Sequence, residues 1–338
     1  EEMDEMDSGQ HMTRRRLAGL VVGAAASAAG AARAQPAVSG PAYPTRPIRL
    51  IVPFGSGSAT DIMTRLLGPH MSQALGQPLV IENRPGAAGV LGSEAVQRAA
   101  PDGHTLLMAA VSSHAIAPAL RREIPYDVMR DFMPIGLSAR STNFIVVHPS
   151  VPARTLPELV EHSKRVSGGV GYASGGIGGS NHLAGELLRL RTGGNFVHVP
   201  YSNQGQAVND VVAGHVPMLI YTVAVLPHVR EGRLRALAVT SEGRQRQAPD
   251  VPTAVEQGAA DVVANSWFGM FGPAGLPEAV RDSVFEALRN ALQDPEISAK
   301  LIDTGLEPSP LPPAEFRRFI ASEIAKWTEV GRAAGIAL

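Results

Sequence analysis

The chain has 338 residues, a formal net charge of −1 and a hydrophobic fraction of 44%. This length and composition predict a globular protein with a sizeable core in two domains, and no Lys/Arg run beyond the N-terminal region indicates a nucleic-acid partner. Because the chain contains no cysteine, disulfides, thiolate metal sites and cysteine nucleophiles are excluded.

The N-terminal region has the order of parts of a signal peptide. Basic residues at Arg14–Arg16 precede an Ala-rich apolar segment, and Ala32-Arg33-Ala34 is a small-residue cleavage site. The apolar segment is shorter than the roughly 20 residues that a membrane span needs. We therefore expect export with cleavage after Ala34, so that residues 1–34 form an N-terminal extension and signal peptide. The Sec and twin-arginine routes both stay open.

The first predicted elements alternate between strand and helix. They are strand Ile48–Val52, helix Thr60–Leu75, strand Leu79–Glu82, helix Val90–Arg98 and strand Leu106–Ala110. Strand, helix and strand in quick succession predict parallel pairing with a right-handed crossover. Ser112, Ser113 and His114 follow the third strand, at the carboxyl edge where open α/β sheets bind ligands.

A first glycine loop, residues 54–58, connects the first strand to the first helix. Gly55 and Gly57 let the backbone turn sharply and let a ligand approach it. Ser58 followed by Asp61 resembles a capping box, which leaves N–H groups and the positive end of the helix dipole at this turn. The loop is a candidate anion site, although on these residues alone a plain, well-capped connection is the simpler interpretation. Asp61 fits a cap better than a ligand contact.

A second α/β series follows the break at Asp131–Gly136. Its predicted elements are strand Phe144–Val147, a helix opened by Thr155 and Glu158 and running to Val166, a strand reaching Tyr172, helix Ser180–Leu190, strand Phe196–Val199, helix Gln204–Ala213, strand Val216–Tyr221, helix Pro227–Glu231 and strand Arg235–Thr240. This series predicts a second doubly wound unit.

The C-terminal part of the chain is expected to return to the first unit. Val262–Phe271 is extended, and the remaining chain is predicted to be helical over Pro277–Leu292, Pro295–Asp303 and Pro313–Arg332. The last helix should pack on the first unit through a set of apolar residues at helical spacing, namely Phe316, Phe319, Ile320, Ile324 and Trp327.

A second glycine loop, residues 174–179, repeats the logic of the first. Gly178 and Gly179 precede Ser180, which is the expected helix cap. With one glycine loop in each unit, a small anion could be held between two sets of backbone N–H groups. The alternative is a flexible surface loop. His182 fits either an anion contact or a histidine bonded to its own loop.

A series of short motifs in this order resembles the Bug receptors, the TctC-type solute-binding proteins of tripartite tricarboxylate transporters. The motifs are Pro53–Asp61, Glu82–Gly89, Pro101–Leu106, Asp131–Ile135, Gly178–Glu186, His198–Tyr201, Arg235–Thr240 and Pro249–Thr253. The resemblance implies an α/β Venus-flytrap of two lobes with a cleft between them, residues 35–138 plus 266–338 and residues 139–265. It also implies a periplasmic receptor that binds a small carboxylate through backbone amides and ordered waters.

The resemblance places the ligand contacts on both glycine loops and their neighbours. The candidate ligand-binding residues are Phe54, Gly55, Ser56, Gly57, Ser58, Asp61, Ser112, Ser174, Gly175, Gly178, Gly179, Ser180, Asn181, His182, Tyr201 and Tyr221. The chain departs from the family pattern at the Gly-Ser-Gly-Ser turn, at Ser202-Asn203 where Lys-Gly is usual, and around Val216–Tyr221, where aspartates are usual. These departures affect the identity of the ligand rather than the fold.

The resemblance further implies that the protein delivers its ligand to membrane permease subunits or acts as an orphan sensor. We expect a monomer that has no cofactor, no metal and no catalytic activity. The rival interpretation is an exported α/β enzyme that binds a dinucleotide or another anionic cofactor at the first glycine loop. Gly55-x-Gly57 with Glu82 after it mimics the dinucleotide fingerprint, but Thr60 stands at the third glycine position. The sequence contains neither a G-x-S-x-G nor an H-E-x-x-H motif.

Backbone-dominated binding leads to a mutational expectation. Ser56→Ala should cost at most about 0.5–1.5 kcal/mol, one neutral hydrogen bond. Gly57→Val and Gly179→Val should abolish binding, on the expectation that these glycines adopt positive φ.

Overall fold

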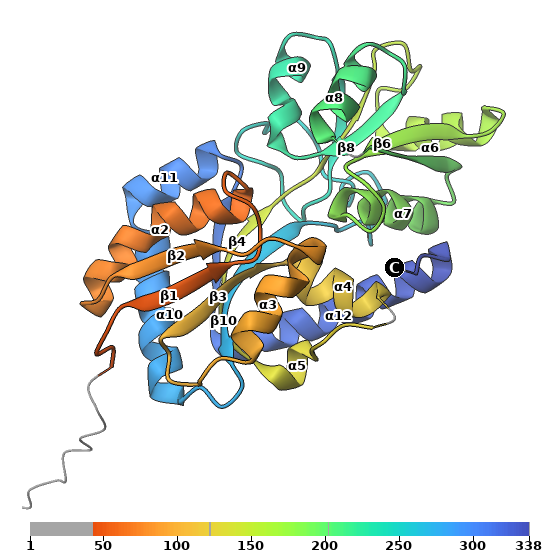
Figure 1. Ribbon diagram of the computed structural model, residues 1–338. Helices are drawn as coiled ribbons and strands as arrows, with labels where there is room; N and C mark the ends of the chain where they lie inside the picture. Colours follow the sequence, from red (N-terminus) through yellow and green to blue (C-terminus); the bar gives the residue numbers. More distant parts are fainter. Residues whose placement is uncertain (1–42, 122, 202, 338) are drawn as a thin grey trace, which may run out of the picture. The chain divides into compact units, whose positions relative to one another are not determined.

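The computed structural model describes residues 43–121, 123–201 and 203–337 (Figure 1). The predicted signal peptide and its cleavage site after Ala34 lie outside these residues. Within the described ranges, each helix is too short or too polar to cross a membrane.

A six-stranded mixed sheet forms the first of two α/β assemblies, with strand order β11-β4-β10-β3-β1-β2. Its strands are β1 (Ile48–Val52), β2 (Leu79–Asn83), β3 (Thr105–Ala110), β4 (Phe132–Ser141), β10 (Ser266–Pro273) and β11 (Glu307–Leu311). As predicted, β1 pairs in parallel with β2 and β3. Strand β10 enters antiparallel between β3 and β4, so the returning chain completes the first sheet.

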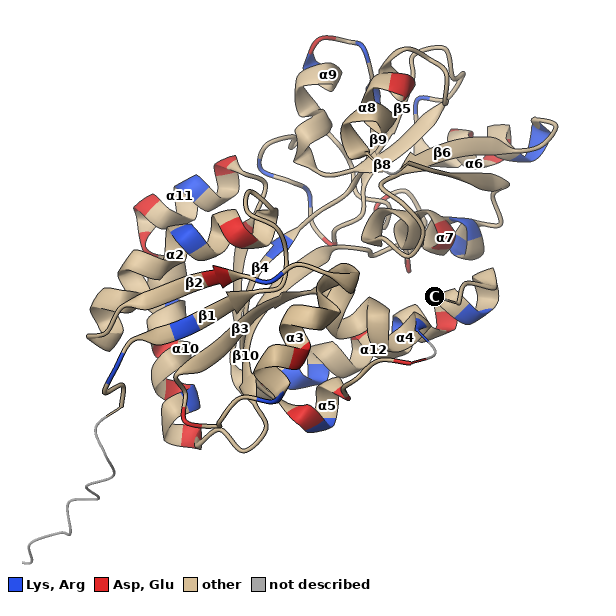
Figure 2. Cartoon of the chain, viewed as in Figure 1, with Lys and Arg blue, Asp and Glu red and all other residues tan. Residues whose placement is uncertain are grey.

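Five helices of this assembly follow the sequence pattern closely, and the short helices α4 and α5 were not predicted. They are α2 (Ala59–Leu75), α3 (Val90–Gln97), α4 (Ala117–Leu120), α5 (Val128–Asp131), α10 (Glu278–Gln293), α11 (Pro295–Asp303) and α12 (Pro313–Ala334). Phe316, Ile320 and Trp327 of α12 are at most 1% exposed, which confirms the predicted core face. Figure 2 shows acidic and basic residues interspersed along α10, α11 and α12.

A five-stranded sheet of order β7-β6-β8-β5-β9 forms the second assembly. Its elements are β5 (Phe144–Val147), α6 (Leu156–Arg165), β6 (Val170–Ser174), α7 (Ser180–Thr192), β7 (Phe196–Pro200), α8 (Gln204–Val212), β8 (Met218–Tyr221), α9 (Leu226–Arg230) and β9 (Arg235–Val239). Strand β6 pairs in parallel with β7 and β8, whereas β5 is antiparallel to both β8 and β9.

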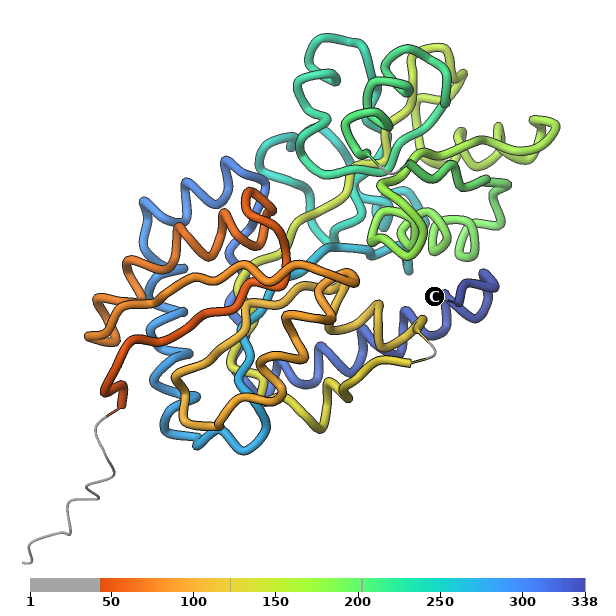
Figure 3. Tube along the Cα trace, viewed as in Figure 1, coloured from red at the N-terminus to blue at the C-terminus, as the bar shows by residue number. Residues whose placement is uncertain are grey.

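The chain passes between the two sheets twice, from β4 to β5 and from β9 to β10, and both passages can be followed in Figure 3. Residues 142–143 form the first passage and residues 240–265 the second. The lobe boundaries expected after residues 138 and 265 stay predictions.

One expectation about the C-terminal part is wrong, because β11 interrupts the helices. Its sequence is Glu-Pro-Ser-Pro-Leu, and it pairs with β4 at the edge of the sheet. Proline has no backbone N–H to donate, so it is tolerated in a strand mainly at an edge. Because it contains two prolines, this segment lacks the pattern typical of a strand, and the sequence did not predict it.

Candidate functional site

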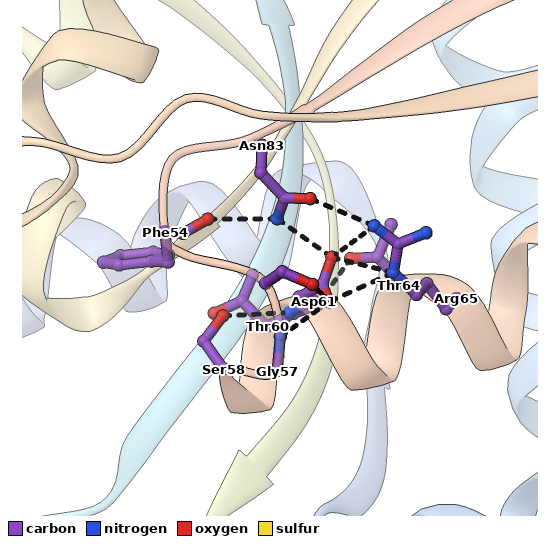
Figure 4. A network of polar contacts seen from close by, with 9 residues as sticks. Phe54, Gly57, Ser58, Thr60, Asp61, Thr64, Arg65 and Asn83 are labelled. Carbon is purple, nitrogen blue, oxygen red and sulfur yellow. Dashed lines mark hydrogen bonds and ion pairs between the residues drawn. The ribbon is translucent and has the colours of Figure 1, made fainter.

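The first glycine loop is held by the buried carboxylate of Asp61 (Figure 4). Its Oδ2 accepts the backbone N–H of Gly57 at 2.9 Å, and both its oxygens accept from Nε of Arg65 at 3.0 Å. Asn83 at the end of β2 donates to Oδ1 of Asp61 at 2.9 Å and to the carbonyl of Phe54 at 3.0 Å. Burial opposes the charge, but the bonds from Arg65, Gly57 and Asn83 lower the pKa of Asp61 to about 2.

This network makes Asp61 the anchor of the loop. Ser58 is the N-cap of α2, as predicted, and its Oγ accepts the N–H of Asp61 at 3.3 Å. The Asp61 carboxylate reaches back to Gly57 rather than to Ser58, so the capping box is shifted by one residue. Ala59 and Thr60 are left as the first-turn N–H groups of α2 that bond to no described residue.

Three connections meet at the carboxyl edge of the first sheet. Gly89 has φ +95°, and a Cβ built on it would lie 3.0 Å from the Phe54 ring and 3.0 Å from Ser113. Phe54, Gly89 and Ser113 follow β1, β2 and β3 respectively. The first glycine loop therefore packs closely against the segment that contains Ser112, and only a glycine fits between them.

His114 lies in the core rather than at the ligand edge that the sequence indicated. Residues Ser112–Ile116 form a short π-helix, and the His114 ring packs against Tyr126, Phe132 and Phe271. Its side chain is 0% exposed, and burial lowers its pKa to about 3. The neutral ring is part of an aromatic cluster, because the chain turns inward directly after β3.

The second glycine loop differs from the sequence expectation in its backbone. Gly178 has φ +76° and Gly176 φ +124°, but Gly179 is extended, with φ −71° and ψ 157°. Gly179 is itself the N-cap of α7 and offers no side-chain cap, so Ser180 is the first helical residue. The predictions of a Ser180 cap and of a positive φ at Gly179 are therefore wrong. Either glycine of such a pair can adopt positive φ, and the surrounding fold decides which one does.

A pair of stacked histidines contacts the second glycine loop from the protein interior. The rings of His182 and His198 are 3.7 Å apart at an interplanar angle of 19°. Nδ1 of His182 accepts the N–H of Gly178 at 3.1 Å, and Nε2 of His198 lies 2.6 Å from Oγ of Ser174. Burial and the neighbouring His182 lower the pKa of His198 to about 4, and burial lowers that of His182 against the attraction of Glu186.

His182 and Ser174 therefore stabilise the second glycine loop through buried hydrogen bonds. Their polar atoms bond to Gly178 and His198 within the protein, and both residues are at most 5% exposed. His198 was not among the predicted site residues. The signal that could have found it is its place on β7, beside the strand that enters the loop.

The side chains at the start of α7 also contact the protein. Asn181 is 6% exposed and donates to Oδ1 of Asn143 at 2.8 Å, and Oγ of Ser180 accepts from Oγ of Ser266 at 3.2 Å. The backbone N–H groups of Ser180, Asn181 and His182 have no acceptor among the described residues. The helix start thus offers backbone donors while its side chains are engaged elsewhere.

The two candidate tyrosines are each bonded to a neighbour. Tyr201 donates to Oδ2 of Asp210 at 2.8 Å, and Tyr221 donates to Oε1 of Gln204 at 2.9 Å. Gln204 also packs on the second glycine loop, because a Cβ built on Gly175 would collide with its amide nitrogen. The structure thus brings Gly175, Tyr201 and Tyr221 into one neighbourhood around α8.

The acidic residue that a dinucleotide-binding enzyme would use, Glu82, is already paired with two arginines. The carboxylate of Glu82 is paired with Arg49 at 2.7 Å and with Arg84 at 2.5 Å, so it is not free to bind a ribose. Over the described parts of the chain, no group of three His, Asp or Glu side chains is placed to bind a metal ion.

Comparison with known proteins identifies the relatives of this fold. The model of the tripartite tricarboxylate transporter family receptor, TctC, matches residues 63–336. Protein BugT of Bordetella pertussis is 37% identical over 303 residues, which cover 89% of this chain and 93% of that protein.

Solved structures give the same answer. The structure of R. palustris Rpa4515 with adipate is 31% identical, has a TM-score of 0.74, and the match covers 87% of this chain and 99% of that one. MatC from Rhodopseudomonas palustris with bound malate is 30% identical with a TM-score of 0.69, over 85% of this chain and 99% of that one. The likeness to solved structures, which include a periplasmic transporter that is 38% identical with a TM-score of 0.74 over 88% of this chain and 99% of that one, confirms the predicted two-lobed α/β fold.

Proposed function

Because this chain belongs to the tripartite tricarboxylate transporter receptor family, we propose that it captures a small organic carboxylate at its two glycine loops. The observation that supports the proposal most is the set of three N–H groups at the start of α7, on Ser180, Asn181 and His182, that have no acceptor in the described parts of the chain. Together with the helix dipole, such groups form a ready anion site. The adipate and malate complexes of related proteins show which probes to try first.

The two loops are unequal in this proposal. The first-turn donors of α2 are Ala59 and Thr60, and they lie beside the ionised carboxylate of Asp61. Arg65 offsets that charge, but the negative group still opposes an anion at α2. The first turn of α7 contains no acidic residue, whereas that of α2 contains Asp61. We therefore assign the ligand carboxylate chiefly to α7, and assign the first glycine loop and Ser112 to the remainder of the ligand.

Location and partners complete the proposal. Members of the family are periplasmic receptors, and we propose that this chain is exported, cleaved after Ala34 and active as a monomer without catalysis. We further propose that it delivers the ligand to membrane permease subunits, which the family match supports. The receptor binds its ligand for transport or sensing and releases it unchanged.

Titration of the mature protein with adipate and malate tests the proposal. A ligand that binds only the native state stabilises it by RT ln(1 + [L]/Kd), about 2.7 kcal/mol at 100 times Kd. We expect the melting temperature to rise with one of these acids and not with its uncharged diamide. Binding of the acid should also decrease the radius of gyration in solution scattering as the lobes close. Equal binding of the diamide, or conversion of the acid to a product, would contradict an anion receptor without catalysis.

A further inference from the structure

A buried asparagine connects the two passages of the chain between the sheets to the start of α7. Asn143 lies directly before β5 and is 0% exposed. Its Nδ2 donates to the carbonyl of Ala264, in the second passage, at 2.7 Å. Its Oδ1 accepts from Nδ2 of Asn181 at 2.8 Å. One side chain therefore contacts both the returning chain and the helix that carries the free N–H groups.

Thr240 completes the junction at the end of β9. Its N–H donates to the carbonyl of Asn143 at 2.9 Å, and its hydroxyl donates to the carbonyl of Ala264 at 2.9 Å. Ala264 in turn donates its N–H to the carbonyl of Thr240 at 3.0 Å. The first and second passages are thus bonded to each other around the buried Ala264 carbonyl, and any relative movement of them must rearrange these bonds.

Asn181 is engaged in the same junction. It lies 6% exposed in the first turn of α7, and a buried amide that loses its partner costs about 1–3 kcal/mol. Ser180, its neighbour, contacts Ser266 at the start of β10. The first turn of α7 is therefore attached through Asn181 to the first passage and through Ser180 to the start of β10.

We propose that Asn143 is a positioning residue for ligand binding, which couples the first turn of α7 to both passages between the sheets. In this view Asn181 acts through Asn143 and not by contact with the ligand. The inference rests on the proposed function, in which the free N–H groups of α7 bind the carboxylate. Coupling between two positions is reciprocal, so a change at either end of the junction is felt at the other.

Two substitutions separate the halves of the junction. Asn143→Asp keeps an acceptor for Asn181 but loses the donor to Ala264. Asn181→Ala removes the bond to the helix and keeps the bond to Ala264. Asn290→Ala, at an exposed position of α10, is the matched control. Circular dichroism and a cooperative melt establish that each variant is folded.

Hydrogen exchange without ligand is the first measurement. We expect both variants to speed exchange in two peptides, residues 180–187 of α7 and residues 262–268 at the end of the second passage and the start of β10, and the control to change neither. If each variant speeds exchange only in the peptide that contains its lost bond, the junction does not transmit and the proposal is wrong. This result does not depend on which ligand binds.

Titration with adipate and malate is the second measurement. Each single variant should weaken binding by about fivefold or more, and the double variant should be no weaker than the worse single one, because residues in one network are not additive. Weak binding by Asn181→Ala with normal binding by Asn143→Asp would show that Asn181 contacts the ligand itself and would overturn the inference. If the wild-type protein binds neither acid, the proposed ligand class fails, while the exchange result still decides whether the junction couples its ends.

Discussion

Replacement of a first-turn residue by proline tests which helix start binds the carboxylate. Ser180 is the first residue of α7 and Ala59 the first of α2. Proline is favoured at this position because its missing N–H has no partner in the helix. The preceding residues are already extended, Gly179 with φ −71° and ψ 157° and Ser58 with φ −66° and ψ 158°, as proline requires. Each substitution therefore removes one donor and keeps the helix.

The expected magnitude follows from the hydrogen bond that is lost. A bond from N–H to a charged acceptor contributes about 1.5–3 kcal/mol, which corresponds to a roughly 10- to 150-fold loss of affinity. We expect Ser180→Pro to show this loss in calorimetric titration with adipate or malate and Ala59→Pro to show little. Ser180→Ala is the control, because it removes the hydroxyl bonded to Ser266 and keeps the N–H.

The result that would refute this reasoning is a reversal. If Ala59→Pro loses affinity and Ser180→Pro binds normally, the carboxylate lies at α2 despite the neighbouring Asp61. Equal losses at both helices would instead indicate an anion shared between the two loops, as the sequence first indicated. Unchanged melting temperatures without ligand establish that neither helix has been damaged.

Four further predictions concern backbone strain, pH and processing. Gly57→Ala should lower stability by about 1–2 kcal/mol relative to Gly55→Ala in thermal melts, because both positions have open space but only Gly57 has a left-handed φ, of +81°; equal effects would exclude backbone strain as the cause. The lowered pKa of Asp61 means that its contribution to stability is present above an unfolded-state pKa of about 4 and is lost as the pH falls toward about 2. The free energy of unfolding of Asp61→Asn should therefore depend less on pH over this range than that of the wild-type protein. The lowered pKa of His198 means that stability is lost as the pH falls from about 6.5 to about 4; His198→Gln should weaken that dependence in melts across this range, and an unchanged slope would contradict it. Mass spectrometry of the exported protein should show cleavage after Ala34, and a mature chain that retains the apolar segment would contradict it.

Local sequence signals predicted most of the fold. Ser58 and Thr155 were expected as helix caps, and their side chains accept the N–H groups of Asp61 and Glu158. Such caps depend on residues three positions apart, so a short stretch contains all the information. The parallel pairing of β1 with β2 and β3 followed likewise from the alternation of strand and helix.

The sequence could not predict features that depend on distant partners. Asn143 precedes an apolar strand and looks like an ordinary turn residue, yet its partners Asn181 and Ala264 lie 38 and 121 residues away. His114 follows β3 where a ligand contact was expected, but its ring meets Phe271 in a strand that returns from the second sheet. In both cases a neighbour brought by topology decides the role of the side chain.

The identity of the ligand cannot be predicted from the sequence, because many polar side chains of the site bond to other residues of the protein. At the second glycine loop and α7, the polar groups of Ser174, Asn181 and His182 are bonded to His198, Asn143 and Gly178. These bonds occupy part of the hydrogen-bonding capacity of the three side chains, and the backbone N–H groups at the helix start are common to every residue type except proline. A site of this kind recognises the charge and shape of a carboxylate. Discrimination among carboxylates must therefore depend on the few side chains without such partners and on how far the lobes can close.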